Sequence, residues 1–139
     1  MDRVEVAAGV VRDTEGRVLI CRRTGDLEGL WEFPGGKREA GETLEACLER
    51  ELREELELAV AAGDVLGEVI REEGGRSVRL VFLAAAAPDR PSLRLHVHGK
   101  AAWVLPEELA RYPFCPADQT FLAKLAAQRP SFFRGKLPF

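Results

Sequence analysis

Between residues 43 and 58 leucine recurs at every fourth position, which predicts a helix with one apolar stripe formed by Leu44, Leu48, Leu52 and Leu56. Glu51, Glu54 and Glu55 are spaced i, i+3 and i+4, so they share one side of this helix. Like charges at that spacing each destabilise a helix by roughly 0.2–0.5 kcal/mol. A hard divalent cation converts the repulsion into coordination, because magnesium is held by carboxylates and by substrate phosphates. The pattern therefore predicts a magnesium site for a phosphorylated substrate.

The alternative is a solvated, glutamate-rich helix face, which is the usual meaning of such runs. It suits Glu45, Glu49 and Glu57. It does not suit Glu55, because a helical wheel of about 100° per residue places this side chain inside the leucine arc. A charge directed at apolar packing is unfavourable unless it is paired or bound to a metal, so we favour the metal site.

Length and charge limit the class of protein. The chain has 139 residues, which predicts a single domain over residues 1–139. Its net charge of −3 favours neither duplex nucleic acid nor an anionic membrane, and no stretch approaches the roughly 20 apolar residues of a membrane span. Three cysteines without a CxxC pair are typical of a reducing compartment, so we expect a cytoplasmic protein. Cys21 and Cys47 are expected in the core, and Cys115 in a loop that can be exposed.

The succession of apolar runs, turns and caps predicts one α/β or α+β domain built on a mixed sheet, with strands before and after a central helix. Thr43 is the expected N-cap of that helix, which should run to about Leu56 or Leu58. The final helix is expected from Pro116 to Gln128. Strands are expected at residues 4–11, 18–21, 65–71, 77–87, 93–98 and 101–105, with an extended segment at 31–34 and a brief helix from Pro106.

The stretch from Gly36 to Leu58 resembles the Nudix box, through the matching residues Gly36, Glu42, Arg50, Glu51, Leu52, Glu54, Glu55 and Leu58. Weaker similarity to MutT-type nucleoside triphosphate pyrophosphohydrolases covers residues 6–12, 20–23, 31–37, 116–118 and 121–125. The resemblance implies an α/β/α sandwich with a mixed central sheet. It also implies hydrolysis of a nucleoside diphosphate linked to a further group, with Mg²⁺ as the cofactor and Mn²⁺ as a substitute.

The same resemblance implies a role for each residue of the site. Glu51 is the leading candidate for the base that takes the proton of an attacking water, with a further contact to the metal. Glu54 and Glu55 are expected metal ligands, and the backbone carbonyl of Gly35 completes the set where the chain must approach the ion closely. Arg50 orients Glu51 through a charge-assisted pair.

Substrate contacts are expected from three other parts of the chain. Arg23 resembles a ligand-contacting arginine, although a solvated arginine at a strand end is an equal alternative. The segment that lines the nucleotide cleft in similar enzymes corresponds here to Glu32, Phe33, Pro34 and Gly35. Asp118 matches a position that presents Asn or Asp to the purine edge, and its alternative role is to cap the last helix.

Two positions depart from the family pattern. Glu57 stands where glycine is usual, so the helix runs one turn further or its end is built differently. Val97 stands where MutT-like enzymes often carry a further glutamate, and His98 either replaces that residue or is structural. Within the box, Glu42 has two open roles, contact with the carboxylate cluster or helix capping.

Together these observations predict hydrolysis of a nucleoside triphosphate to the monophosphate and pyrophosphate, with oxidised purine dNTPs, ordinary dNTPs and CTP as candidate substrates. The alternatives are a Nudix hydrolase of ADP-ribose, dinucleoside polyphosphates or RNA 5′ ends, and a nucleotide sensor without catalysis. The phenylalanine-rich tail after Arg129 is expected to cover an apolar edge, join a dimer interface or stay disordered, so a monomer and a homodimer both remain open.

Overall fold

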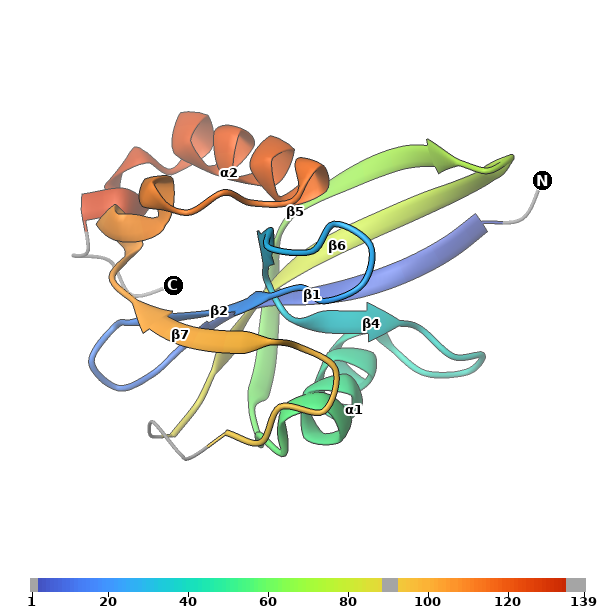
Figure 1. Ribbon diagram of the computed structural model, residues 1–139, viewed down its shortest axis with the longest axis horizontal. Helices are drawn as coiled ribbons and strands as arrows, with labels where there is room; N and C mark the ends of the chain where they lie inside the picture. The colour runs from blue at the N-terminus through green and yellow to red at the C-terminus, as the bar shows by residue number, and fades with distance from the viewer. Residues whose placement is uncertain (1–2, 89–92, 135–139) are drawn as a thin grey trace.

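The computed structural model of the chain describes residues 3–88 and 93–134 (Figure 1). Its elements, in chain order, are β1 (Arg3–Arg12), β2 (Val18–Arg22), β3 (Trp31–Glu32), β4 (Gly35–Lys37), α1 (Leu44–Leu56), β5 (Ala61–Glu73), β6 (Arg76–Ala86), β7 (Lys100–Val104), the 3₁₀ helix η1 (Pro106–Arg111), α2 (Pro116–Gln128) and the 3₁₀ helix η2 (Pro130–Arg134). Among these described residues, no helix has the length and apolar character needed to cross a bilayer.

The strands form one mixed, seven-stranded sheet around β1. The main order is β3-β2-β1-β6-β5, with β4 paired to β1 and β7 paired to β2. Strand β1 runs parallel to β6, in a register that extends from Arg3↔Ser77 to Arg12↔Ala86, and antiparallel to β2 and β4. The second half of β1 is buried throughout, which is why its apolar run does not alternate with polar residues.

Helices cover both faces of this sheet, so the predicted α/β/α sandwich is confirmed (Figure 1). Helix α1 lies on one face and buries its leucine stripe against β1, β2 and β6. Helix α2 and the two 3₁₀ helices lie on the other face, where Phe121 stacks on Phe82 with ring centroids 4.1 Å apart. Helix α1 and the start of α2 therefore lie on opposite sides of the central strands β1 and β6.

The ends of the two long helices follow the expected signals. Thr43 caps α1, because its hydroxyl accepts a hydrogen bond from the N–H of Ala46 at 3.0 Å. The helix ends at Leu56, because Glu57 takes a left-handed conformation with φ 54° and ψ 39°. Helix α2 begins at Pro116, as its sequence predicts. Neither possibility at the glycine-to-glutamate change holds: the helix does not run on, and Glu57 itself takes the left-handed conformation that glycine would take at this cap.

The structure corrects three expectations. Residues 93–98 are not a strand, because two of their N–H groups bond to carbonyls at the end of α1 and none of them joins the sheet. Strand β5 begins at Ala61, four residues before the expected start, because a bulged register continues its pairing with β6. Cys115 is buried, with 5% of its surface exposed, because its N–H bonds to the carbonyl of Trp31 at the edge of the core.

The tail is divided between described and undescribed residues. Phe132 is buried in the core on the α2 face and lies under the guanidinium of Arg12, 5.6 Å from its ring centroid. Phe133 packs against it edge to face. This part of the tail therefore covers an apolar edge, and the expectation for Phe139 lies outside the described residues.

Candidate active site

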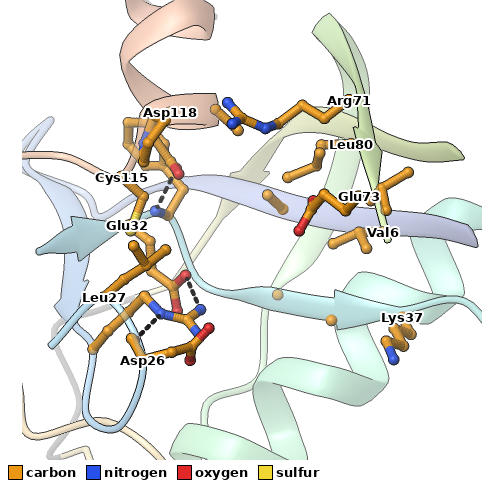
Figure 2. A pocket seen from close by; sticks show the side chains of 18 of the residues that line it. Val6, Asp26, Leu27, Glu32, Lys37, Arg71, Glu73, Leu80, Cys115 and Asp118 are labelled. Atoms are coloured by element: carbon orange, nitrogen blue, oxygen red, sulfur yellow. Dashed lines mark hydrogen bonds and ion pairs between the residues drawn. The ribbon is translucent and has the colours of Figure 1, made fainter. Parts of the chain in front are cut away.

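A cleft of about 980 Å³ opens between the start of α2, the β5–β6 hairpin and the side of β4. Val6 from β1 and Leu80 from β6 give it an apolar lining, and Glu55 is the one residue of α1 that reaches it. Figure 2 shows Asp118 and Glu32 along one side of the cleft, with Arg71, Leu80 and Val6 across from them. A volume of this order is typical of a site for a small-molecule ligand.

The glycine pair of β4 brings the backbone into contact with both β1 and α1. Gly35 pairs with Ala8, and a Cβ on Gly35 would overlap the backbone carbonyl of Ala7. A Cβ on Gly36 would overlap the carboxylate of Glu51. Glycine is therefore required at position 35, where a Cβ would meet the backbone of β1, whereas a side chain at position 36 would force the Glu51 carboxylate to move away from β4.

Arg50 fixes the carboxylates around that contact. Its guanidinium binds Glu42 in a bidentate pair, with N···O distances of 2.7 and 3.0 Å. The same group reaches Glu51 at 3.1 Å and Glu54 at 3.2 Å. These hydrogen bonds from Arg50 hold the pKa of Glu42 down at about 2. Since Thr43 caps the helix, Glu42 acts on the cluster through Arg50.

Glu55 is the carboxylate that departs most from ordinary behaviour. Burial raises its pKa to about 8, and a hydrogen bond with Glu51 and the negative charges of Glu51, Glu32 and Glu54 add to the effect. Neighbouring carboxyl groups that repel one another in this way are stabilised by a proton or by a cation between them. The oxygen donors of Glu51 and Glu55 thus fit a hard divalent ion.

Glu54 lies farther from this pair. Its side chain is 60% exposed and turned toward Arg50, whereas the side chain of Glu51 is 14% exposed. Within residues 3–88 and 93–134, no three acidic, cysteine or histidine side chains are already gathered at the spacing of metal ligands. The structure therefore brings Glu51 and Glu55 together and leaves the Glu54 side chain exposed beside Arg50, on the same side of the helix.

Asp118 forms the opposite end of the cleft. It is 5% exposed, and its Oδ1 accepts a hydrogen bond from the N–H of Phe33 at 3.0 Å. Burial raises its pKa to about 7, and the Phe33 N–H partly offsets that rise. Cys115, and not Asp118, occupies the N-cap position of α2, so the capping alternative for Asp118 is wrong.

The remaining expected residues connect these two ends. Arg23 lines the cleft, and its guanidinium is paired with Glu32 at 2.9 Å and with Asp26 at 2.9 Å. Glu32 also contacts Nε2 of His98 at 2.8 Å, so His98 binds this carboxylate and not the glutamates of α1. The carbonyl of Pro34 accepts from the N–H of Gly9 at 2.8 Å. Phe33 is buried and contributes its backbone, not its ring, to the cleft side near Asp118.

Among the cleft residues that the sequence did not indicate are two charged side chains of one strand. Arg71 and Glu73 come from β5, and Figure 2 shows Arg71 reaching from that strand toward the side of α2. Within residues 3–88 and 93–134, the backbone of Arg71 pairs with Val78, but its guanidinium makes no hydrogen bond or ion pair. The expected strand ended at Arg71, whereas β5 continues to Glu73, and the spacing of two residues then places both side chains on one face of the strand.

An acidic helix pressed against a glycine pair, at one end of a nucleotide-sized cleft, defines a hydrolase of phosphoric anhydrides. The profile of the NUDIX domain matches residues 2–125, and so the chain belongs to the Nudix family. It is an enzyme of the pyrophosphohydrolase type, as the resemblance of residues 36–58 implied.

Similar proteins share nearly the whole chain. It is 38% identical over 138 residues to a CTP pyrophosphohydrolase of Escherichia coli, covering 94% of this chain and 99% of that protein. It is also 38% identical over 131 residues to a putative 8-oxo-dGTP diphosphatase 2 of Mycobacterium tuberculosis, covering 91% of this chain and 89% of the relative. The solution structure of the E. coli ORF135 protein superposes with a TM-score of 0.76 at 37% identity, covering 94% of this chain and 96% of that one.

Proposed function

We propose that this enzyme hydrolyses a nucleoside triphosphate to the monophosphate and pyrophosphate in the cytoplasm, with Mg²⁺ as its cofactor. The observation that carries the proposal is the placement of the Glu51–Glu55 carboxyl pair and the buried Asp118 at the two ends of one cleft. One end suits a cation and phosphates, and the other suits a polar base edge. The names of two similar proteins, which refer to CTP and 8-oxo-dGTP, support a nucleoside triphosphate as the substrate.

The residues that would hold the metal are Glu51, Glu54 and Glu55, together with the backbone carbonyl of Gly35. Carboxylate and carbonyl oxygens are the ligands that Mg²⁺ prefers, and Mn²⁺ accepts the same set. When bound, the ion neutralises charge on the phosphates. Gly36 makes this approach possible, because any side chain there would occupy the position of the Glu51 carboxylate.

Glu51 is the proposed base. It takes a proton from a water whose oxygen bonds to phosphorus, while the anhydride P–O bond breaks and pyrophosphate leaves. Arg50 holds the Glu51 carboxylate at 3.1 Å and thereby limits its rotation. The side chain of Glu51 is 14% exposed, so few positions remain for that water.

Asp118 is the proposed contact to the base. An ionised carboxylate only accepts hydrogen bonds, which suits a base edge with neighbouring donors such as guanine N1–H and its amino group. A protonated Asp118 donates, which suits a base with an acceptor in that place. Arg23, Glu32, Phe33 and Gly35 line the cleft between Asp118 and the metal end, whereas Pro34, expected there from the sequence, does not line it and bonds through its carbonyl to Gly9.

The test is pyrophosphate release from a panel of nucleoside triphosphates in magnesium, ranked by kcat/KM. Glu51→Gln should lower kcat by about 10³, within the range that general-base catalysis contributes, while the far-UV circular dichroism spectrum stays unchanged. Glu45→Gln, on the exposed side of the same helix, is the matched control and should retain full activity. Nucleotide binding without turnover in the native protein, or full turnover by Glu51→Gln, would contradict the proposal.

A further inference from the structure

The left-handed cap of α1 is occupied by a residue that is poorly suited to it. Glu57 has φ 54° and ψ 39°, and its N–H bonds to the carbonyl of Arg53 at 3.1 Å. Glycine adopts this conformation freely, whereas a residue with a Cβ adopts it at an energetic cost. The backbone alone therefore gives no reason for glutamate at this position, and the reason must lie in its side chain.

The Glu57 side chain binds the segment that precedes β7, which is here called the 93–99 segment. Its Oε2 lies 2.8 Å from Nε2 of His96, and its Oε1 lies 3.8 Å from Nε of Arg94. The backbone of the same segment caps the helix, because the N–H groups of Arg94 and His96 bond to the carbonyls of Leu56 and Glu55, each at 3.1 Å. The 93–99 segment is thus attached to α1 by two backbone bonds and by the Glu57 carboxylate.

The other end of the 93–99 segment forms a wall of the cleft. Val97 and His98 both line the cleft. The carbonyl of Val97 accepts from the hydroxyl of Thr24 at 3.0 Å, and His98 contacts Glu32 at 2.8 Å. A displacement at His96 would therefore be passed to the side chain of His98 and to its partner Glu32, two residues further along the chain.

We propose that Glu57 is a positioning residue, whose carboxylate holds the 93–99 segment in place so that His98 and Val97 form the cleft wall before the substrate arrives. This inference rests on the proposed function, because it assigns the wall to the same nucleotide site. Glu57 does not line the cleft, so its effect on binding passes through His96. A wall that is already ordered spares the substrate the entropic cost of ordering it.

The proposal predicts opposite changes in stability and in substrate binding for Glu57→Gly. Removal of the left-handed strain should raise Tm by about 3 °C. Loss of the carboxylate should raise KM about three- to fivefold, the most that an exposed pair contributes, with kcat changed less than twofold. Glu57→Gln keeps an acceptor oxygen at the same reach and should restore KM to within twofold of the native value. If Glu57 only stabilised the fold, Glu57→Gly would raise KM and lower Tm.

His96→Ala is the second variant, because it removes the partner and leaves the backbone of Glu57 unchanged. It should raise KM as much as Glu57→Gly without raising Tm, and the double variant should show no additional increase in KM. Amide hydrogen exchange without nucleotide gives a readout that does not depend on activity. Exchange of the backbone N–H groups at positions 96 and 99 should accelerate in both single variants, even if no nucleoside triphosphate is hydrolysed. Unchanged exchange in both variants, or an additive rise in KM in the double variant, would overturn the proposal.

Discussion

The two ends of the cleft each hold a carboxyl group with a raised pKa, partly buried at Glu55 and buried at Asp118, but their neighbours differ. At the α1 end, burial raises the pKa of Glu55 to about 8, and the carboxylates of Glu51, Glu32 and Glu54 raise it further. At the α2 end, burial raises the pKa of Asp118 to about 7, while the N–H of Phe33 works in the opposite direction. The first group is surrounded by negative charge, and the second already has a hydrogen-bond donor.

This difference teaches what each end requires. Like charges around Glu55 can be relieved only by a proton or a cation. Asp118 already accepts hydrogen bonds from backbone N–H groups, and the charges of Glu32 and Arg23 act on it in opposite directions, so a neutral group with a matching hydrogen-bond pattern is enough. The same direction of pKa shift therefore indicates a cation site at one end and a recognition site at the other.

Among the variants that test this comparison, Glu55→Gln should cause the largest loss of activity. A glutamine removes one negative ligand, so kcat/KM in saturating magnesium should fall at least about a hundredfold, since a metal's stabilisation of transition-state charge is worth several kcal/mol. Titration of activity with magnesium should show a higher half-saturating concentration. An unchanged magnesium dependence would remove Glu55 from the set of ligands.

The same variant tests the charge at that end without metal. The pKa of Glu55 is raised from its ordinary value of 4.5 to about 8 in the folded protein, so the folded state binds this proton more tightly. The free energy of unfolding of the metal-free protein should therefore fall as the pH rises from about 4.5 through 8. Denaturant titrations at several pH values should show this slope in the native chain and a flatter one in Glu55→Gln.

A smaller effect, on discrimination among bases, is expected from a substitution of Asp118. Asp118→Asn keeps an acceptor for Phe33 and adds a donor, so kcat/KM ratios between bases should change roughly 10- to 100-fold, the equivalent of one mismatched buried hydrogen bond. In the native enzyme, preference for bases that offer donors should grow as the pH rises through about 7, and the variant should lose this dependence. An equal loss with every base would assign Asp118 a structural role. Asp64→Asn, an exposed carboxylate on β5, is the control.

The smallest effect is expected from Arg50→Lys. Lysine cannot form the bidentate pair with Glu42 while it also contacts Glu51, so the base should lose part of its orientation. Activity should fall about tenfold, as for other groups that orient a catalytic side chain from behind. Arg53→Lys, three residues away and exposed, should be silent. Equal activities of the two variants would show that Glu51 needs no such support.

Local signals explain what the sequence could predict. Thr43 and Pro116 mark the starts of the two helices by capping and by ring geometry, which depend on a few neighbouring residues. Glu55 stood out because helical periodicity alone placed it beside the leucines, and the structure places it partly buried at the cleft.

Contacts between distant segments explain the rest. The partner of Asp118 is the Phe33 N–H, 85 residues earlier, and no local pattern indicates that pair. Arg71 reaches the cleft only because the β5–β6 hairpin is long. The 93–98 segment alternated like a strand, but its N–H groups found carbonyls at a helix end, which only the folded chain brings near. Glu57 was visible as an exception, and its partner His96 was not.

The glycine pair of β4 also determines where this enzyme can diversify. A side chain at Gly35 would overlap the Ala7 carbonyl, and one at Gly36 would overlap the Glu51 carboxylate. We therefore expect substitutions at these two sites to be selected against. Across the cleft, Arg71 and Asp118 come from separate elements and present only their side chains. A directed-evolution library aimed at new nucleotides should therefore randomise the hairpin and the start of α2, and leave the glycines untouched.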